Sequence, residues 1–148
     1  MNTSTTFNQI NHFMATQKLK ISSATENIFL VEKFIEEACE KFHITEEHYG
    51  NILIAITEAV NNAIQHGNKS NPNKNILITL TSEKNKISFT IEDEGNGFDF
   101  SNIPDPTNPE NIEKPNGRGV FLMRNLADNV CFFDKGKKVE LDFNIFAN

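Results

Sequence analysis

Three polar side chains at four-residue spacing could act together in this sequence. Glu58, Asn62 and His66 lie in the segment TEAVNNAIQHGN, and on a helix such steps keep side chains on one face, with a drift of about 40° per step. Asn is a poor residue in a helix interior because its amide competes with the backbone, so the Asn61-Asn62 pair needs a reason. A functional polar face is one reason, and a solvated edge beside an apolar stripe is the other. His66 and Gly67 also fit a structural role, as an imidazolium and a left-handed stop at a helix C-terminus.

A second group is the carboxylate in IEDEGNGFD. Asp93 continues the period-two apolar row of the strand before it, so it points to the buried face of the sheet, where a carboxylate needs hydrogen-bond donors. The exocyclic amine of a base would supply one, and Gly95 and Gly97 would let the backbone approach a flat ligand. A plain Asp/Gly/Asn turn is the alternative. A calcium loop fits badly, because the twelfth position is Pro104 where a Glu is needed.

The third group is PNGRGVFLMRNLAD, where two glycines precede an apolar run. Gly117 and Gly119 at the start of a helix would present free N–H groups to an anion, and Arg118 could neutralise a phosphate or remain a solvated loop charge. The spacing is neither GxxxxGK[ST] nor GxGxxG, so it supports neither a P-loop nor a Rossmann site.

A long connection separates the two glycine motifs. Residues 98–116 are rich in proline, and unstructured loops above about 12–15 residues in compact domains are often lids. The position is the one that a lid over a nucleotide would need. Disorder without a function is the competing interpretation.

The elements that position these groups follow from periodicity and turn residues. We expect strands at 17–21, 75–82, 86–93, 129–133 and 138–146, and helices at about 22–42, 45–67 and 119–127. Thr45 is the expected N-cap of the second helix, with acidic residues in its first turn. Together they predict an α+β fold: a two-layer α/β sandwich with a mixed, mostly antiparallel sheet covered on one face by helices.

Length and composition indicate one domain. The chain has 148 residues and a net charge of −6, which argues against non-specific nucleic-acid binding. It has no apolar stretch long enough for a membrane helix and no signal-peptide pattern, so we expect a cytoplasmic protein without direct nucleic-acid or membrane contacts. Two distant cysteines suggest no disulfide framework. We expect a polar tail or loose first element at 1–15 and one domain at 16–148.

The order of the motifs resembles the GHKL superfamily of gyrases, histidine kinases, mismatch-repair proteins and heat-shock chaperones. EAVNNAIQHG is similar to its N-box, DEGNGFD to its G1 box and GRGVFLMRNLAD to its G2 box. The match covers roughly Ile54 to the C-terminus. Within the superfamily, the form of the first and last boxes resembles the stand-alone anti-sigma-factor serine kinases, and it implies the histidine-kinase-like ATPase fold.

The resemblance implies ATP and Mg²⁺ as cofactors and a role for each candidate residue. Glu58 would be the general base, Asn62 the magnesium ligand and Asp93 the carboxylate that reads adenine. The remaining nucleotide-binding residues would be His66 near the lid hinge, Gly95 and Gly97 at the adenine pocket, and Gly117, Arg118 and Gly119 at the phosphates. Lys137 stands where many relatives have the threonine of a Gly-Thr pair that helps to hold the adenine-binding aspartate.

The leading hypothesis is therefore an ATP-dependent serine kinase that phosphorylates an anti-sigma-antagonist domain and sequesters a sigma factor. The first alternative is a GHKL binding module that senses nucleotide and switches partners without kinase activity. Retention of Glu58 favours the enzyme, and loss of the Gly-Thr pair favours the module. A second alternative, a GHKL ATPase fragment that performs conformational work, is disfavoured by the lack of a further domain. The sequence does not decide whether the chain forms a homodimer.

Overall fold

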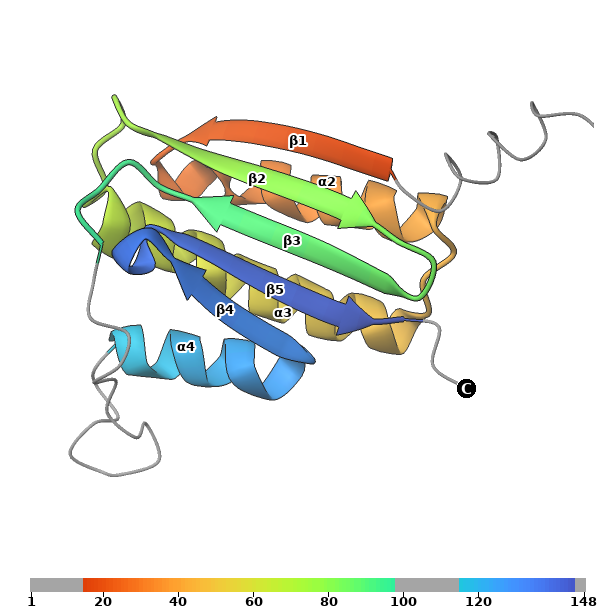
Figure 1. The fold of residues 1–148 in the computed structure, drawn as a ribbon. Coiled ribbons are helices and arrows are strands. Elements are labelled where there is room, and N and C mark those ends of the chain that lie inside the picture. The colour runs from red at the N-terminus through yellow and green to blue at the C-terminus, as the bar shows by residue number, and fades with distance from the viewer. Residues whose placement is uncertain (1–14, 98–114, 146–148) are drawn as a thin grey trace, which may run out of the picture.

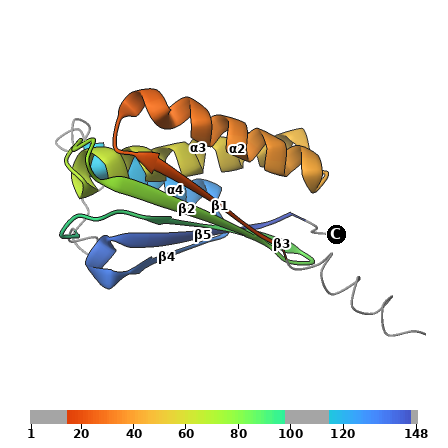
Figure 2. The same cartoon turned by 90° about the horizontal axis from the view of Figure 1, so that it is seen from above.

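One five-stranded sheet with helices on one face forms the protein, whose computed structural model describes residues 15–97 and 115–145, with the backbone alone at 115 and 116. Figure 1 shows the strands in the order β1-β2-β3-β5-β4, and Figure 2 shows α2, α3 and α4 on the same side of the sheet. The elements are β1 (Ala15–Ser22), α2 (Ile28–Lys41), α3 (Glu46–Asn62), β2 (Asn75–Ser82), β3 (Lys86–Glu92), α4 (Pro115–Leu126), β4 (Asn129–Phe133) and β5 (Lys138–Asn144). The predicted α+β two-layer sandwich is confirmed.

The sheet is more regular than the sequence analysis expected. All four pairings between neighbouring strands are antiparallel, so the described part of the chain contains no parallel pair where a mixed sheet was predicted. β1 begins at Ala15, which places the last residue of the expected tail inside the sheet. None of the helices within the described ranges is both long and apolar enough to cross a membrane.

The hydrophobic core lies between the sheet and the helices. Period-two alternation places one row from each central strand against the helices, and nearly every member of these rows is fully buried. The α2 and α3 stripes cover the rows from the other side, and burial of each large apolar side chain stabilises the fold by roughly 1.5–3 kcal/mol. The fully buried members include Val31, Ile35, Ile52, Ile56, Ile64, Ile76, Ile78, Leu80, Ile87 and Phe89.

Helix α3 begins as predicted and ends differently. The Thr45 hydroxyl accepts a hydrogen bond from the His48 N–H at 3.3 Å, as an N-cap should. At the other end the chain widens into a π-helical turn over Ala63–Gly67, which is closed by a 2.8 Å bond from Asn68 N–H to Ala63 O. Gly67 is not left-handed, so the prediction of a glycine stop was wrong; the positive φ angles follow at Lys69 and Ser70.

Helix α4 begins earlier than its pattern indicated. It starts at Pro115, a residue favoured at the first helical position, so Gly117 and Gly119 lie within its first two turns and not before it. The last two residues of the predicted lid at 98–116 therefore belong to α4. Residues 98–114 and 1–14 lie outside the described residues.

Candidate functional site

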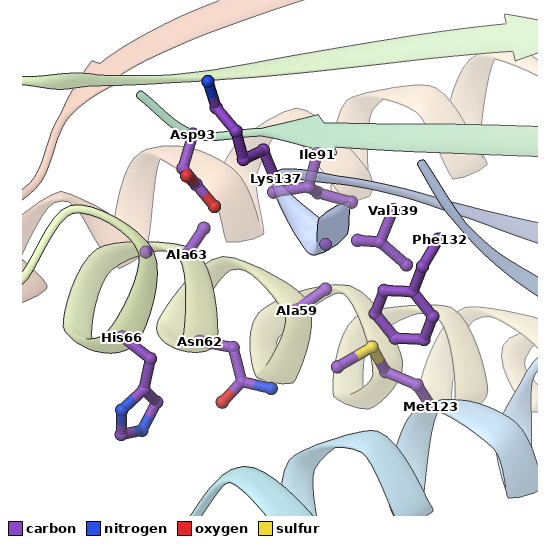
Figure 3. Close-up of a pocket in the computed structure, with 12 residues that line it drawn as sticks. Ala59, Asn62, Ala63, His66, Ile91, Asp93, Met123, Phe132, Lys137 and Val139 are labelled. Atoms are coloured by element: carbon purple, nitrogen blue, oxygen red, sulfur yellow. The ribbon is translucent and has the colours of Figure 1, made fainter. Parts of the chain in front are cut away.

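A pocket opens between α3 and the end of the sheet where β3 stops and β5 begins. It holds about 400 Å³ of space, counting the part open to solvent. Figure 3 shows its side chains converging from α3, β3, α4 and the β4–β5 pair. The lining residues are Ala59, Asn62, Ala63, His66, Gly67, Ile91, Asp93, Met123, Phe132, Gly136, Lys137 and Val139.

Asp93 is the buried carboxylate of this pocket. It lies just beyond the end of β3, on the core-facing row as predicted, and is only 8% exposed. Its Oδ1 accepts a 2.8 Å hydrogen bond from Gly95 N–H, while Oδ2 accepts none from the described residues. Burial raises the pKa of Asp93, and the Gly95 hydrogen bond and the Lys137 charge oppose that rise. A carboxylate oxygen that accepts no hydrogen bond from the described chain is suited to an N–H donor from a ligand.

Glycines allow three backbone segments to close around Asp93. A Cβ on Gly67 would collide with the Asp93 carboxylate, and a Cβ on Gly95 would collide with the Gly67 carbonyl. Gly97 has a φ of +85°, and its Cβ would collide with the Lys135 carbonyl. These positions require glycine because the Asp93 carboxylate or a neighbouring carbonyl already occupies the space that a Cβ would take, so the three segments pack closely around Asp93.

The polar face of α3 forms the other side of the pocket. Figure 3 shows Asn62 and His66 pointing toward the α4 side of α3, while Asp93 approaches α3 from the sheet. Gly119 packs directly on Asn62, since a Cβ there would lie 2.8 Å from Asn62 Nδ2. Glu58 lies one turn before Asn62 and is half-buried, but it is not among the pocket-lining residues.

The surroundings of His66 disfavour its charged form. Burial lowers its pKa, and the charge of Lys69 lowers it further, which opposes the imidazolium that the helix end was expected to favour. Its Nε2 is buried without a hydrogen-bond partner in the described structure. A neutral imidazole nitrogen without a partner is available to a ligand that enters the pocket.

Lys137 enters the site by its backbone as well as its side chain. Its carbonyl accepts a 2.9 Å hydrogen bond from Asp93 N–H. The chain just before β5 therefore holds the Asp93 backbone, although the threonine hydroxyl that many relatives have at this position is absent here. The Lys137 stem lines the pocket, and Figure 3 shows the ammonium extending past Asp93. The neighbouring turn is bent, with positive φ angles at Asp134, Lys135 and Gly136.

The residues present fit an adenine nucleotide with magnesium. The apolar walls and the glycine-lined approach suit a flat base, and Asp93 Oδ2 suits its amine. No three His, Cys, Asp or Glu side chains of the described ranges form a metal cluster, so Mg²⁺ would need phosphate oxygens beside Asn62. That arrangement is usual for Mg²⁺, which keeps few protein ligands at nucleotide sites.

The predicted residues are only partly brought together. Asn62, His66 and Asp93 line the same pocket. Gly95, Gly97 and Gly119 pack against the lining or the neighbouring turns. Gly117 and the exposed Arg118 lie in the first turn of α4. Sequence reasoning missed the apolar wall of Met123 and Phe132, which looked like ordinary core positions. It also missed the buried Asn68, because one asparagine in a polar loop carries no signal.

Comparisons with known proteins agree with this geometry. The family model of the histidine kinase-like ATPase domain matches residues 21–143. The chain is 26% identical to the serine-protein kinase RsbW of Bacillus cereus (strain AH820) over 129 residues, which cover 82% of this chain and 80% of that protein. It is 28% identical to the serine-protein kinase RsbW of Staphylococcus aureus (strain JH9) over 123 residues, covering 78% and 77%.

A solved structure shares the fold. The crystal structure of the RsbU and RsbW domains of a Mycobacterium tuberculosis protein superimposes with a TM-score of 0.65 at 12% identity. The match covers 88% of this chain and 32% of the other, so this chain spans about a third of that protein. At this identity the likeness concerns the fold alone.

Proposed function

Since the chain belongs to the histidine kinase-like ATPase domain family, we propose that it is an ATP-dependent serine protein kinase and anti-sigma factor. It phosphorylates a serine of an anti-sigma-antagonist domain and sequesters a sigma factor in the cytoplasm. The observation that carries the proposal is the buried Asp93 carboxylate, whose free Oδ2 faces a glycine-lined pocket beside the polar face of α3. The similarity to two serine-protein kinases named RsbW supports the reaction class.

Adenine binding would use the sheet side of the pocket. Asp93 accepts a hydrogen bond from the adenine amine, where guanine presents a carbonyl instead, so the site discriminates between the two bases. Ala59, Ala63 and Ile91 supply small and apolar walls around the base. The glycines let the surrounding backbone pack closely enough to hold the Asp93 carboxylate at this wall of the pocket.

Phosphate binding would use the α4 side of the pocket. Asn62 holds the magnesium ion through its amide oxygen, and the neutral His66 offers an unpaired ring nitrogen nearby. The first turn of α4, at Gly117 and Arg118, presents N–H groups and a guanidinium to the phosphates. Mg²⁺ bound with ATP supplies neutralisation of the phosphate charge during transfer.

Phosphoryl transfer needs a base close to the acceptor hydroxyl. Glu58 lies one helical turn from Asn62 and outside the pocket lining, so its carboxylate can meet a serine that a partner brings to the pocket. Glu58 would take the serine proton while the serine oxygen attacks the terminal phosphorus in line, and the bond from that phosphorus to the bridging oxygen would break to release ADP.

The reaction itself is the decisive test. The purified chain is incubated with γ-labelled ATP, Mg²⁺ and an antagonist domain encoded near it, and the Glu58→Gln variant serves as the control. Label on a serine of the domain in the parent reaction alone supports the kinase. ATP binding that alters partner binding without any label supports the alternative, a nucleotide-sensing module.

A further inference from the structure

A buried side chain outside the pocket connects three segments next to Asp93. Asn68 is 1% exposed and follows the π-helical turn at the end of α3. It is not among the described residues that line the pocket, so it cannot touch a ligand there directly. Any effect it has on the site must pass through the residues that it holds.

Both groups of the Asn68 carboxamide, the oxygen and the NH₂, are hydrogen-bonded. Its Oδ1 accepts a 2.7 Å hydrogen bond from Glu94 N–H. Its Nδ2 donates to Ser23 Oγ at 2.6 Å and to the Asn75 carbonyl at 3.0 Å. Both N–H donors of the amide are therefore used, and they join the end of β1 and the start of β2 to the loop after β3.

The Glu94 bond fixes the peptide group that follows Asp93. The peptide before Asp93 is held by the bond from its N–H to the Lys137 carbonyl, and the carboxylate is held by Gly95 N–H. With the Asn68 bond added, both peptide groups flanking Asp93 and one of its oxygens are fixed. The direction of Oδ2 then follows from the backbone and not from a free rotation.

Among the described residues, a second side-chain hydrogen bond also holds Glu94. The Asn75 N–H donates to the Glu94 carboxylate, but that contact is exposed, and hydrogen bonds in water contribute less than buried ones. The Ser23 hydroxyl in turn holds the Asn68 amide, since its Oγ accepts a hydrogen bond from Asn68 and donates one to the Lys74 carbonyl. Ser23 makes no contact with Glu94, so it is a matched control for the general stability of this corner.

We propose that Asn68 is a positioning residue for adenine recognition, which fixes the Asp93–Glu94 peptide so that Asp93 Oδ2 faces the base. The inference rests on the proposed function, because it takes Asp93 to be the group that reads adenine. It assigns base selectivity to a residue that the nucleotide does not touch. The consequence is a loss of selectivity, and not only of stability, when the Asn68 amide is changed.

Calorimetric titration of three proteins with Mg·ATP and Mg·GTP tests the proposal. Asn68→Ala removes the oxygen that accepts from Glu94 N–H together with both N–H donors, and it adds no charge beside Asp93. We expect its ATP affinity to fall roughly tenfold, the effect of one buried hydrogen bond, while its GTP affinity changes little. In the control, Ser23→Ala should lower the melting temperature and retain the parental preference for ATP.

The possible outcomes separate a positioning role of Asn68 from general loosening of the fold and from failure of the proposed function. An unchanged ATP-to-GTP ratio in Asn68→Ala overturns the positioning role, and so does an equal loss of the ratio in Ser23→Ala, which would indicate general loosening. If Asn68→Ala does not fold, amide exchange of the parent gives the answer: Glu94 is exposed, so a slowly exchanging Glu94 N–H without nucleotide requires the Asn68 bond. Rapid exchange overturns the tether. A parent that binds neither nucleotide overturns the proposed function itself, whatever Glu94 shows.

Discussion

Asp93 is a buried residue with one carboxylate oxygen held by Gly95 and one that accepts no hydrogen bond from the described chain. Asp93→Asn should weaken ATP binding by roughly 1–3 kcal/mol, because an amide placed against the adenine amine leaves a buried polar group mismatched. Calorimetry with ATP and GTP measures the change. Equal affinity of the parent for both nucleotides would contradict the assignment of Asp93 to adenine.

Glu58 and Asn62 lie one turn apart on α3, yet their substitutions should have different effects. Glu58→Gln should abolish phosphoryl transfer and leave ATP affinity nearly unchanged, since a general base acts on the acceptor hydroxyl and not on the nucleotide. Single-turnover transfer and equilibrium binding are measured on the same preparation.

Asn62→Ala is the matched comparison, because it should weaken binding of ATP in the presence of Mg²⁺ and leave binding in EDTA little changed.

For the Glu58→Gln variant, phosphoryl transfer at the parental rate would show that Glu58 is a structural residue.

The contact between α3 and α4 is the feature of interest at the scale of elements. Gly119 lies in α4 without a positive φ, so it is needed for proximity and not for backbone freedom. Its absent Cβ leaves space for the Asn62 amide, which is the end of a short side chain that can rotate away. The two helices and the Asn62 side chain are therefore coupled at one position.

Gly119→Ala should separate stability from binding. Alanine in a helix interior is favoured over glycine by up to about 1 kcal/mol, so the melting temperature should stay the same or rise. The added Cβ would displace the Asn62 amide, so Mg·ATP affinity should fall. Thermal unfolding and calorimetry on the variant measure both. A variant with parental affinity would show that the Asn62 side chain does not act in binding, and a large fall in melting temperature would show that α4 itself is displaced.

At the scale of the whole molecule, the buried thiol of Cys39 on α2 makes the stability of the fold depend on pH. Burial raises its pKa from 9.0 to about 11, because the thiolate is poorly solvated there. The unfolded chain then loses the thiol proton at a lower pH than the folded chain. The contribution of Cys39 to stability is present below pH 9.0 and is lost as the pH rises toward 11.

Urea unfolding between pH 8 and 11 measures this effect. The free energy of unfolding of the parent should fall more steeply above pH 9.0 than that of Cys39→Ala, although the variant starts lower because of its smaller side chain. Lysine titration is common to both proteins and cancels in the difference. Parallel curves would mean that the thiol is solvated in the folded state.

The sequence by itself determined the elements and the side of the sheet on which Asp93 lies. Period-two and helical periodicities are local, so they gave the strands, α2, α3 and the buried row that ends at Asp93. The polar face with Asn62 was also visible, since spacing on one helix needs no tertiary information. The order of the boxes then predicted the family, which the match over residues 21–143 confirms.

Only the tertiary structure decided why particular residues are needed. Gly67 was predicted to be a helix stop, but it is needed because the Asp93 carboxylate lies against it, 26 positions away in the chain. The hydrogen bond from Asp93 N–H to the Lys137 carbonyl and the one from Glu94 N–H to the Asn68 side chain also join distant segments. The lowered pKa of His66 depends in the same way on what buries its ring. Desolvation and hydrogen bonding depend on what packs against a group, and a linear pattern records the group but not its neighbours.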